Sequence, residues 1–438
     1  MVRRVSRPRP RLAFHRRAVT VEGMRRLAVL MSIFVALVAT GCASMFRATT
    51  FDASTVEGAV QASNAFAFDF YRKVQKQKRN DNVVCSPAGA VIALTMVAAG
   101  ARGETQTEML QTLRFQAANL DQTYRSVADI LDAMKARDGK DGLVLSVADR
   151  VWVQDGLVLR SEYESLLRDQ FRAPIVQLDF AGKNAAALAA INQWSSDETH
   201  GRIPRILEHV EGPMVLANAI YMLGEWQQPF AESATTDDPF TTAAGETTVK
   251  MMKQLSSFWY AEVRGAKLVE LPYKGGLSMI VVLPDDVDGL ERIEDRIGDS
   301  YGDWIQALKT QRVDLKLPRF TTATDQTLNC LLGEMGIRRA FVPPHDDPNK
   351  GADFSGMTGA PTFYIGQAIQ KAWIETTEKG TEAAAVTVVE MIEVVSLIDS
   401  PPPPPPVVFH ADHPFMYLIR DTKSGEILFI GRVVKPAA

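Results

Sequence analysis

Few side chains in this sequence have the types and spacing that a catalytic or metal site requires. His410, Asp412 and His413 stand close together, and imidazole and carboxylate groups are zinc ligands. They directly precede an expected strand, so we expect them to be structural and not to bind a metal. His345 and Asp347 lie in a proline-rich insertion, where a solvated loop is expected.

The motifs of the common enzyme classes give no better candidate. The sequence has no phosphate-binding Walker loop and no His-Glu-x-x-His metalloprotease motif. We also expect no nucleophile elbow of the Gly-x-Ser-x-Gly type, because no nucleophile can be matched with a base that would activate it. The sequence therefore predicts a protein that is not an enzyme and needs no cofactor.

Residues 371–393 carry the most informative pattern in the chain. The alanines at 383–385 favour a helix, whereas the valine-rich run at 386–389 favours a strand. With a period of two, one face consists of Thr381, Ala383, Ala385, Thr387 and Val389, and the other of Glu382, Ala384, Val386, Val388 and Glu390. The first face is small or apolar, as in a strand that can enter a sheet with little bulk to accommodate. Gly380 provides a hinge, and no proline interrupts the run.

The start of this stretch resembles the reactive-centre loop hinge of the serpins almost residue for residue. The matching residues are Glu378, Lys379, Gly380, Thr381, Glu382, Ala383, Ala384 and Ala385. The resemblance implies that the segment is stored outside a sheet and joins it as an added strand once the loop is cut. The rest of the chain must then supply a sheet with room for that strand.

Further motifs resemble serpin segments and occur in the same order. They are Asn-x-x-x-Ser-Pro at 82–87, Gly-x-x-x-x-Thr at 100–105, Asn-Ala-Ile-Tyr followed by Gly-x-Trp and Pro-Phe within 214–230, Ala-Asp-Phe-Ser-Gly at 352–356, and strands at 249–252, 269–273, 277–284, 313–320, 413–417 and 428–433. Patterning adds helices at 56–75, 89–99, 161–171, 185–198 and 328–335, and a strand at 144–154. The resemblance covers residues 55–438 and implies one α+β domain of the serpin fold. That fold has a large central sheet A, sheets B and C, eight or nine helices, and an exposed reactive-centre loop near residues 378–408.

The resemblance also assigns three residues to the gate through which the loop strand enters: Ser86, Asn192 and Gln370. Two positions depart from the family pattern. Gly89 stands where a second serine is usual, which removes part of the polar cluster expected beneath the main sheet. Gln370 stands where many serpins have a histidine, and glutamine cannot titrate, so pH-linked opening is not expected there.

The resemblance implies suicide inhibition of a serine protease, which is trapped as a covalent acyl-enzyme when the cut loop inserts. Family spacing from Glu378 places the cleaved bond between Val394 and Val395, and small aliphatic side chains there suit elastase-like enzymes. Neighbouring candidates are Met391, Ile392 and Leu397, and cleavage at Leu397 would instead favour chymotrypsin-like enzymes. The proline run at 401–406 is interpreted as a stiff spacer, although it could alter how the bait is presented. A non-inhibitory serpin and an inhibitor of cysteine proteases remain as alternatives.

The first 41 residues read as an export signal. Arg25 and Arg26 precede an apolar run at 27–39 that is short for a membrane span, and Met24 is an alternative start. Residues 39–42 resemble a bacterial lipobox, which predicts lipid attachment at Cys42, a tether at 42–54 and anchoring to the cell envelope. An ordinary cleavable signal with secretion is the alternative.

The charge of the chain bears on nucleic-acid binding, and its cysteines bear on disulfide pairing. Residues 1–26 hold nine arginines and one glutamate, so the rest of the chain has 39 basic and 51 acidic residues, a net charge of −12. This acidic body is not expected to bind nucleic acid. Cys85 and Cys330 could pair in an oxidising compartment, but nothing in the sequence favours it. We expect a monomer.

Overall fold

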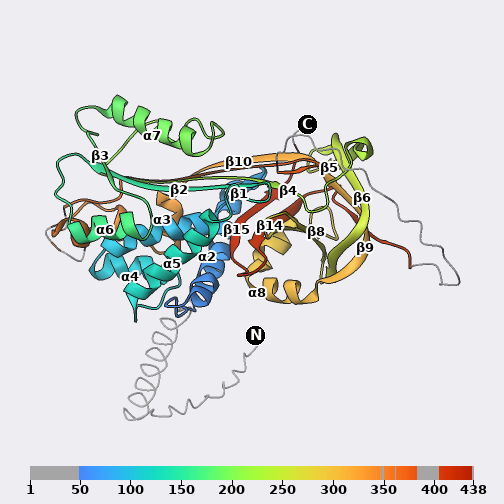
Figure 1. Cartoon of the computed structure of the whole chain (residues 1–438), viewed down its shortest axis with the longest axis horizontal. Helices are drawn as coiled ribbons and strands as arrows, with labels where there is room; N and C mark the ends of the chain where they lie inside the picture. The colour runs from blue at the N-terminus through green and yellow to red at the C-terminus, as the bar shows by residue number, and fades with distance from the viewer. Residues whose placement is uncertain (1–48, 346, 348–349, 361, 382–403, 437–438) are drawn as a thin grey trace, which may run out of the picture. The chain divides into compact units, whose positions relative to one another are not determined.

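Two β-sheets and nine α-helices make up the described part of the chain, which in this computed structural model is residues 49–345, 347, 350–360, 362–381 and 404–436 (Figure 1). From Thr50 onward these residues belong to one unit, Thr50–Ala438. The mixture of helices and sheets within one unit confirms the α+β class that the sequence predicts. Among the described helices, none combines the length and the apolar character needed to cross a membrane.

The six-stranded sheet is built around β4, a strand that is apolar along most of its length. Its order is β10-β11-β4-β2-β3, with the short β12 also paired to β4. Their bounds are β2 (Leu143–Gln154), β3 (Val176–Leu178), β4 (Met214–Glu225), β10 (Phe320–Thr327), β11 (Gln367–Thr376) and β12 (Gly380–Thr381). Because both faces of β4 are covered, it reads as a continuous apolar run and not as an alternating one. Strand β2 pairs with it antiparallel and β11 pairs with it parallel.

The remaining strands form one nine-stranded hydrogen-bonded sheet, where the sequence predicts two further sheets, B and C. Its order is β1-β15-β14-β8-β7-β6-β9-β13, with β5 paired to β6. The 19-residue β6 pairs with β5 at its start and with β7 at its end, which makes the hydrogen-bonded sheet continuous. The bounds are β1 (Val83–Cys85), β5 (Thr236–Thr242), β6 (Gly245–Val263), β7 (Ala266–Pro272), β8 (Leu277–Pro284), β9 (Lys309–Pro318), β13 (Val407–His410), β14 (Phe415–Asp421) and β15 (Ile427–Val433).

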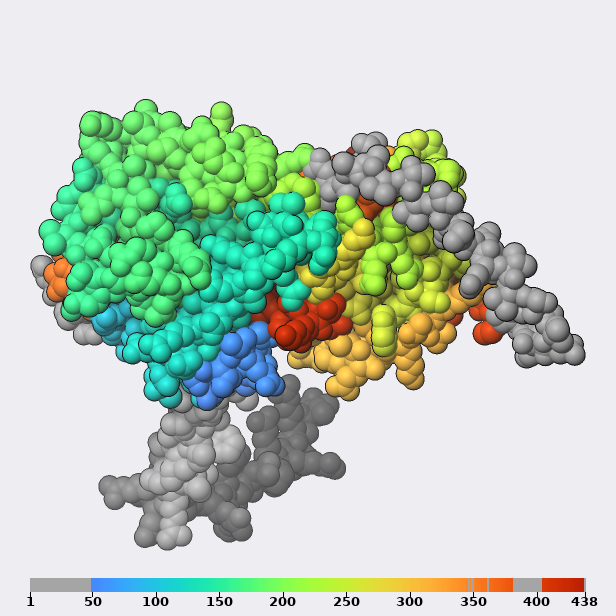
Figure 2. Space-filling view, viewed as in Figure 1, coloured from blue at the N-terminus to red at the C-terminus, as the bar shows by residue number. Residues whose placement is uncertain are grey.

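The helices cover the six-stranded sheet on two sides (Figure 1). Helix α3 is buried along its whole length, which its apolar sequence allows, and Ser86 caps it by accepting a hydrogen bond from the Gly89 amide. On the opposite face α7 packs through Trp194 against Trp152 of β2, with ring centroids 4.8 Å apart. Figure 2 shows the green surface of the segment that contains α7 on that side. The helices are α2 (Val56–Gln77), α3 (Pro87–Gly100), α4 (Gly103–Thr112), α5 (Leu120–Lys135), α6 (Ser161–Asp169), α7 (Asn184–Glu198), α8 (Leu290–Ala307), α9 (Asn329–Met335) and α10 (Ser355–Thr358).

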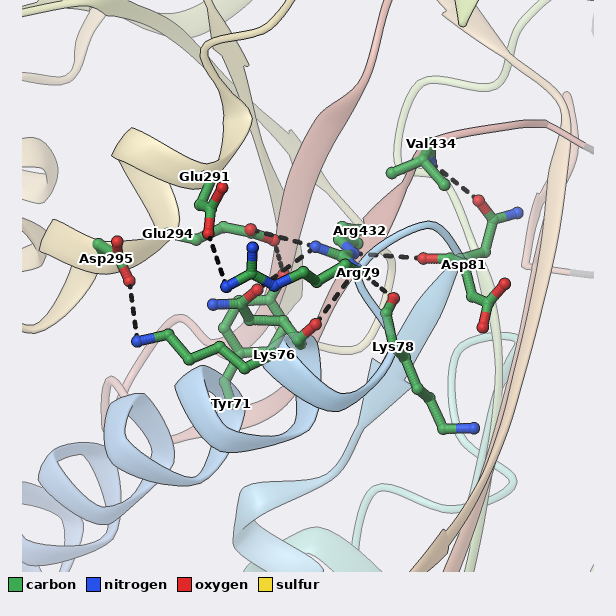
Figure 3. A network of polar contacts seen from close by, with 12 residues as sticks. Tyr71, Lys76, Lys78, Arg79, Asp81, Glu291, Glu294, Asp295, Arg432 and Val434 are labelled. Carbon is green, nitrogen blue, oxygen red and sulfur yellow. Dashed lines mark hydrogen bonds and ion pairs between the residues drawn. The ribbon is translucent and has the colours of Figure 1, made fainter. Parts of the chain in front are cut away.

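A buried ionic network ties α2, α8 and β15 together (Figure 3). Arg432 of β15 lies 3.3 Å from a carboxylate oxygen of Glu294 in α8, and Tyr71 of α2 donates to the other oxygen at 2.5 Å. The guanidinium also donates to the backbone carbonyls of Gln75 and Lys78 at the end of α2. Removing one member of such a buried pair generally costs about 3–5 kcal/mol, because its partner is left without a counter-charge. The network therefore fixes the helices beneath the sheets.

Candidate functional site: the seam between β4 and β11

The seam between β4 and β11 is a parallel ladder that ends before the strands do. The pairing runs from Gln367 opposite Val215 to Trp373 opposite Tyr221. Beyond Tyr221, β4 continues for four residues to Glu225, and β11 continues to Thr376. Parallel ladders are slightly less stable per residue than antiparallel ones. Of the two parallel pairs in this sheet, β2 with β3 and β4 with β11, only the second has a neighbouring segment, β12, at its open end.

The chain reverses direction directly after β11 and begins to fill the open end of the seam. A tight turn pairs Thr377 with Gly380, with hydrogen bonds in both directions at 2.7 and 3.2 Å. Strand β12 then runs antiparallel to β4, with Gly380 opposite Glu225 and Thr381 opposite Gly224. Two residues of the predicted hinge have therefore already joined the sheet.

Gly380 is required at this point by a close approach of two backbones. Its φ angle is +138°, and a Cβ atom placed on it would lie 1.9 Å from the carbonyl oxygen of Gly224. Any side chain would push β12 away from β4. A glycine is thus required at position 380 by the close contact with β4, in addition to the hinge role that the sequence predicts for it.

The segment that follows β4 holds the turn in place through its backbone. Trp226 donates from its amide to the carbonyl of Lys379 and from its indole nitrogen to that of Thr377, each at 2.9 Å. The Phe230 amide donates to the Glu378 carbonyl at 2.8 Å. The indole is itself fixed, because it is buried and stacks on Tyr273 with ring centroids 4.2 Å apart. The turn is therefore a rigid base for the loop.

The carboxylate of Glu378 adds a charged anchor to the turn. It is buried and accepts hydrogen bonds from Arg319, with Nε at 2.7 Å, and from the hydroxyl of Thr235 at 2.5 Å. Burial alone would raise the pKa of Glu378, but the hydrogen bonds from Arg319 and Thr235 outweigh it and hold the pKa below its usual value. The anchor is thus ionised at neutral pH and weakens only as the pH falls below the ordinary range of a carboxyl group.

A hydrogen-bonded row of polar side chains crosses the sheet near the middle of the seam. Gln370 of β11 donates to the amide oxygen of Asn218 on β4 at 2.8 Å, and Asn218 donates to Asp149 on β2 at 2.8 Å. Gln370 also exchanges hydrogen bonds with the backbone of Ser86, at 2.7 and 2.9 Å. We call Ser86, Gln370, Asn218 and Asp149 the polar row. It joins β2, β4 and β11, and its bond between Gln370 and Asn218 crosses the seam along which β4 and β11 would have to part.

The polar row revises two expectations from the sequence. Gly89 does not leave a gap in it, because a Cβ atom at this position would lie 2.6 Å from the amide nitrogen of Asn218. The glycine makes room for that amide. Asn192 does not join Ser86 and Gln370, since it lies on α7 and bonds the backbone of Ile206 and Leu207 at 2.8 to 2.9 Å. It holds the connection after α7, and Asn218 is the asparagine that contacts Gln370.

Aromatic and basic side chains cover the last paired position of the seam on the α7 side. Tyr221 and Trp373, which face each other across the ladder, have ring centroids 5.6 Å apart. The guanidinium carbon of Arg202 lies 4.8 Å from the Trp373 ring centre, and His200 packs edge-on against Tyr221. A strand that entered the seam would have to displace this cover first.

The remaining predicted site residues fall outside the described part of the chain. These are Cys42 and the loop residues Glu382, Ala383, Ala384, Ala385, Val394 and Val395. The histidines that are not expected to bind a metal make contacts within the fold. His410 lies 3.1 Å from Asp314, and His413 forms hydrogen bonds with Asp412 and with the carbonyl of Pro284. Within the described residues, no group of three or more potential ligands is placed to hold a metal ion.

One motif escaped the sequence analysis. Residues 298–302, Gly-Asp-Ser-Tyr-Gly, do match the Gly-x-Ser-x-Gly pattern. They lie inside α8, however, and a nucleophile elbow requires a sharp turn between a strand and a helix. The match is therefore incidental.

Comparison with known proteins finds similarity to inhibitors and to a binding protein. A family model described as Serpin (serine protease inhibitor) matches residues 61–436. The leukocyte elastase inhibitor of Sus scrofa is 32% identical over 392 residues, which cover 86% of this chain and 98% of that protein. Serpin48 of the insect Tenebrio molitor superposes with a TM-score of 0.74 at 29% identity, covering 86% and 98% of the two chains. Thyroxine-binding globulin in complex with thyroxine gives 0.76 at 25% identity, covering 86% and 99%.

Proposed function

This chain belongs to the serpin family, and we propose that it inhibits serine proteases by trapping them as acyl-enzymes. The family also has non-inhibitory members, among them thyroxine-binding globulin, so membership alone does not assign the activity. The choice between these possibilities depends on whether the loop can enter the sheet.

The observation that carries the proposal is the antiparallel start of β12 at the open end of the seam. If the loop continues in the same register, Glu382 will pair with Leu223 and Ala383 with Met222, and the strand will then pass between Tyr221 and Trp373. The inserted strand would run antiparallel to both β4 and β11. One parallel ladder would be replaced by two antiparallel ladders, which are the more stable kind. The small inward face from Thr381 to Val389 presents little bulk to this movement.

The trapping step follows from ordinary acyl transfer. The protease serine attacks the carbonyl carbon of Val394, the bond to Val395 breaks, and a new amino terminus leaves. The protease then stays attached through an ester to the segment that begins at β12. Insertion carries it along the sheet and distorts its site before water can cleave the ester.

We propose elastase-like enzymes as the targets. The bait residues Val394 and Val395 are small and aliphatic, and a relative with 32% identity is named a leukocyte elastase inhibitor. Leu397 would redirect the preference to chymotrypsin-like enzymes. Cleavage sites mapped by mass spectrometry will distinguish the two.

The direct test is to mix the full chain with pancreatic elastase, chymotrypsin and a cysteine protease, and to separate the products on a denaturing gel. We expect a covalent band at the summed mass with a serine protease, together with loss of protease activity. If every serine protease cuts the loop without forming that band, the non-inhibitory interpretation holds. A band with the cysteine protease alone would reassign the target class.

We further propose that the protein is exported and anchored to the cell envelope by lipid on Cys42. The support is the order of basic, apolar and small residues before this cysteine. Stable anchoring needs more than one acyl chain, as a lipidated and acylated cysteine would provide. Mass spectrometry of the membrane fraction from expressing bacteria should find a lipid-modified peptide that begins at Cys42. An unmodified peptide in the medium, with the Cys42→Ser variant indistinguishable, would show simple secretion.

A further inference from the structure

Asp149 is a carboxylate on the inward side of β2, which is otherwise apolar along the strand. On the inward side of β2, its neighbours Leu143, Leu145, Val147, Val151 and Val153 are all buried in the main core. Its Oδ1 accepts from Asn218, while its Oδ2 is buried and has no hydrogen-bond partner among the described residues. An unsatisfied carboxylate oxygen in such a place is costly, so it calls for an explanation other than packing.

We propose that Asp149 is a positioning residue that sets how readily the seam between β4 and β11 opens, by fixing the orientation of the Asn218 amide. This proposal rests on loop insertion as the proposed function and identifies a residue that regulates it. Asp149, Asn218 and Gln370 lie opposite one another in register on β2, β4 and β11. A strand entering the seam must separate Gln370 from Asn218 but leaves Asn218 beside Asp149.

The effect follows from the hydrogen-bonding capacity of the two forms of the carboxyl group. An ionised carboxylate only accepts, so it requires the NH₂ group of Asn218. The oxygen of that amide is then directed at the Nε2 of Gln370, and the seam is closed by the observed 2.8 Å bond. A protonated carboxyl can donate to the amide oxygen instead. It would let the amide turn its NH₂ group toward the NH₂ of Gln370, and the bond across the seam would be lost.

The surroundings allow this proton to come and go at neutral pH. Burial raises the pKa of Asp149 to about 7, and the hydrogen bond from Asn218 and the charge of Lys135 on α5 limit the rise. Helix α3, which packs beneath the polar row, has no charged side chain, and β4 presents Asn218. Arg150 is a neighbour in sequence, but it pairs with Glu198 and lies over Trp194 on the α7 side of the sheet. The sequence predicts no pH-linked opening at Gln370, which replaces a histidine, whereas the titrating group in this proposal is Asp149.

The test measures how fast the uncut full chain takes up a synthetic peptide with the sequence of residues 381–394. Uptake needs the seam to open but needs no protease. We expect uptake to be about three- to tenfold faster at pH 5.5 than at pH 8.5, as loss of one hydrogen bond predicts. Asp149→Asn cannot titrate and should give one rate across this range. Asp325→Asn, which removes a carboxylate on the exposed edge of the same sheet, is the matched control and should keep the wild-type profile.

A merely structural role for Asp149 predicts the opposite sign. A raised carboxyl pKa means that the fold is more stable with the proton bound, and that this stability is lost as the pH rises from 3.8 through about 7. A loosened fold would then open faster at high pH. A flat wild-type profile, faster uptake at high pH, or an Asp149→Asn profile like that of the wild type would each overturn the proposal.

A second readout separates failure of this proposal from failure of the proposed function. If no variant takes up peptide, insertion itself is in question. Hydrogen exchange of the amides at 369–371 in β11 then decides the role of Asp149, with wild type and Asp149→Asn compared at each pH. Selectively faster exchange in the wild type at low pH supports the proposal, and equal exchange in the two proteins contradicts it.

Discussion

Thr381→Arg is expected to turn the protein from an inhibitor into a substrate of its target protease. Thr381 is the second residue of β12 and pairs with Gly224. In the period-two pattern of the sequence it is the first residue of the small face that is predicted to enter the sheet. Its backbone is already paired in the uncut protein, but an arginine there would have its charge enclosed once the following residues insert beside β4, which costs several kcal/mol when the charge is unpaired. Insertion would slow, and hydrolysis of the acyl-enzyme would finish first.

The measurement is the number of inhibitor molecules consumed for each protease molecule inactivated. For a barrier raised by even 1.4 kcal/mol, insertion slows about tenfold, and the stoichiometry should rise accordingly while cleavage of the loop continues. The matched control is Glu382→Arg, which places the same side chain one residue later on the opposite face. Inhibition should survive in that variant. Equal inhibition by Thr381→Arg and the wild type would show that the protease is stopped by some means other than insertion.

Several helices and a strand that form or cover the six-stranded sheet could be predicted from the sequence, because each is long and has a clear apolar pattern. The helices expected at 56–75, 89–99 and 185–198 correspond to α2, α3 and α7, with small shifts at their ends. The strand expected at 144–154 corresponds to β2. These segments have apolar periodicity, caps or breakers that depend on local sequence alone.

Contacts between distant segments could not be predicted in the same way. The glutamate at 378 is recognisable as part of a hinge pattern, but its buried pairing with Arg319 depends on how β9 meets the turn after β11. Asn192 and Asn218 are both polar residues within expected elements, and only the register of β4 against β11 shows which one meets Gln370. Asp149 did leave a signal, since it interrupts an alternating apolar row, and a polar residue on the inward face of a strand is worth following.

Cutting the loop is expected to raise the melting temperature of the protein by about 20 °C, because roughly ten new backbone hydrogen bonds at about 0.5–1.5 kcal/mol each would form. The uncut protein would therefore be held in a state that is not its most stable one, and only the intact loop would keep it there. The first pairs, at Gly380 and Thr381, already exist, so the remaining strand need only extend a ladder that has begun.

Circular dichroism before and after cleavage checks this expectation, with the cut mapped by mass spectrometry to residues 382–403. The cut Thr381→Arg variant serves as the control and should gain less, because its inward face resists burial. A cut wild-type protein that melts at the temperature of the intact one would place this chain with the non-inhibitory members of its family. The antiparallel pair at β12 would then be a fixed end of the sheet and not the beginning of a full-length strand between β4 and β11.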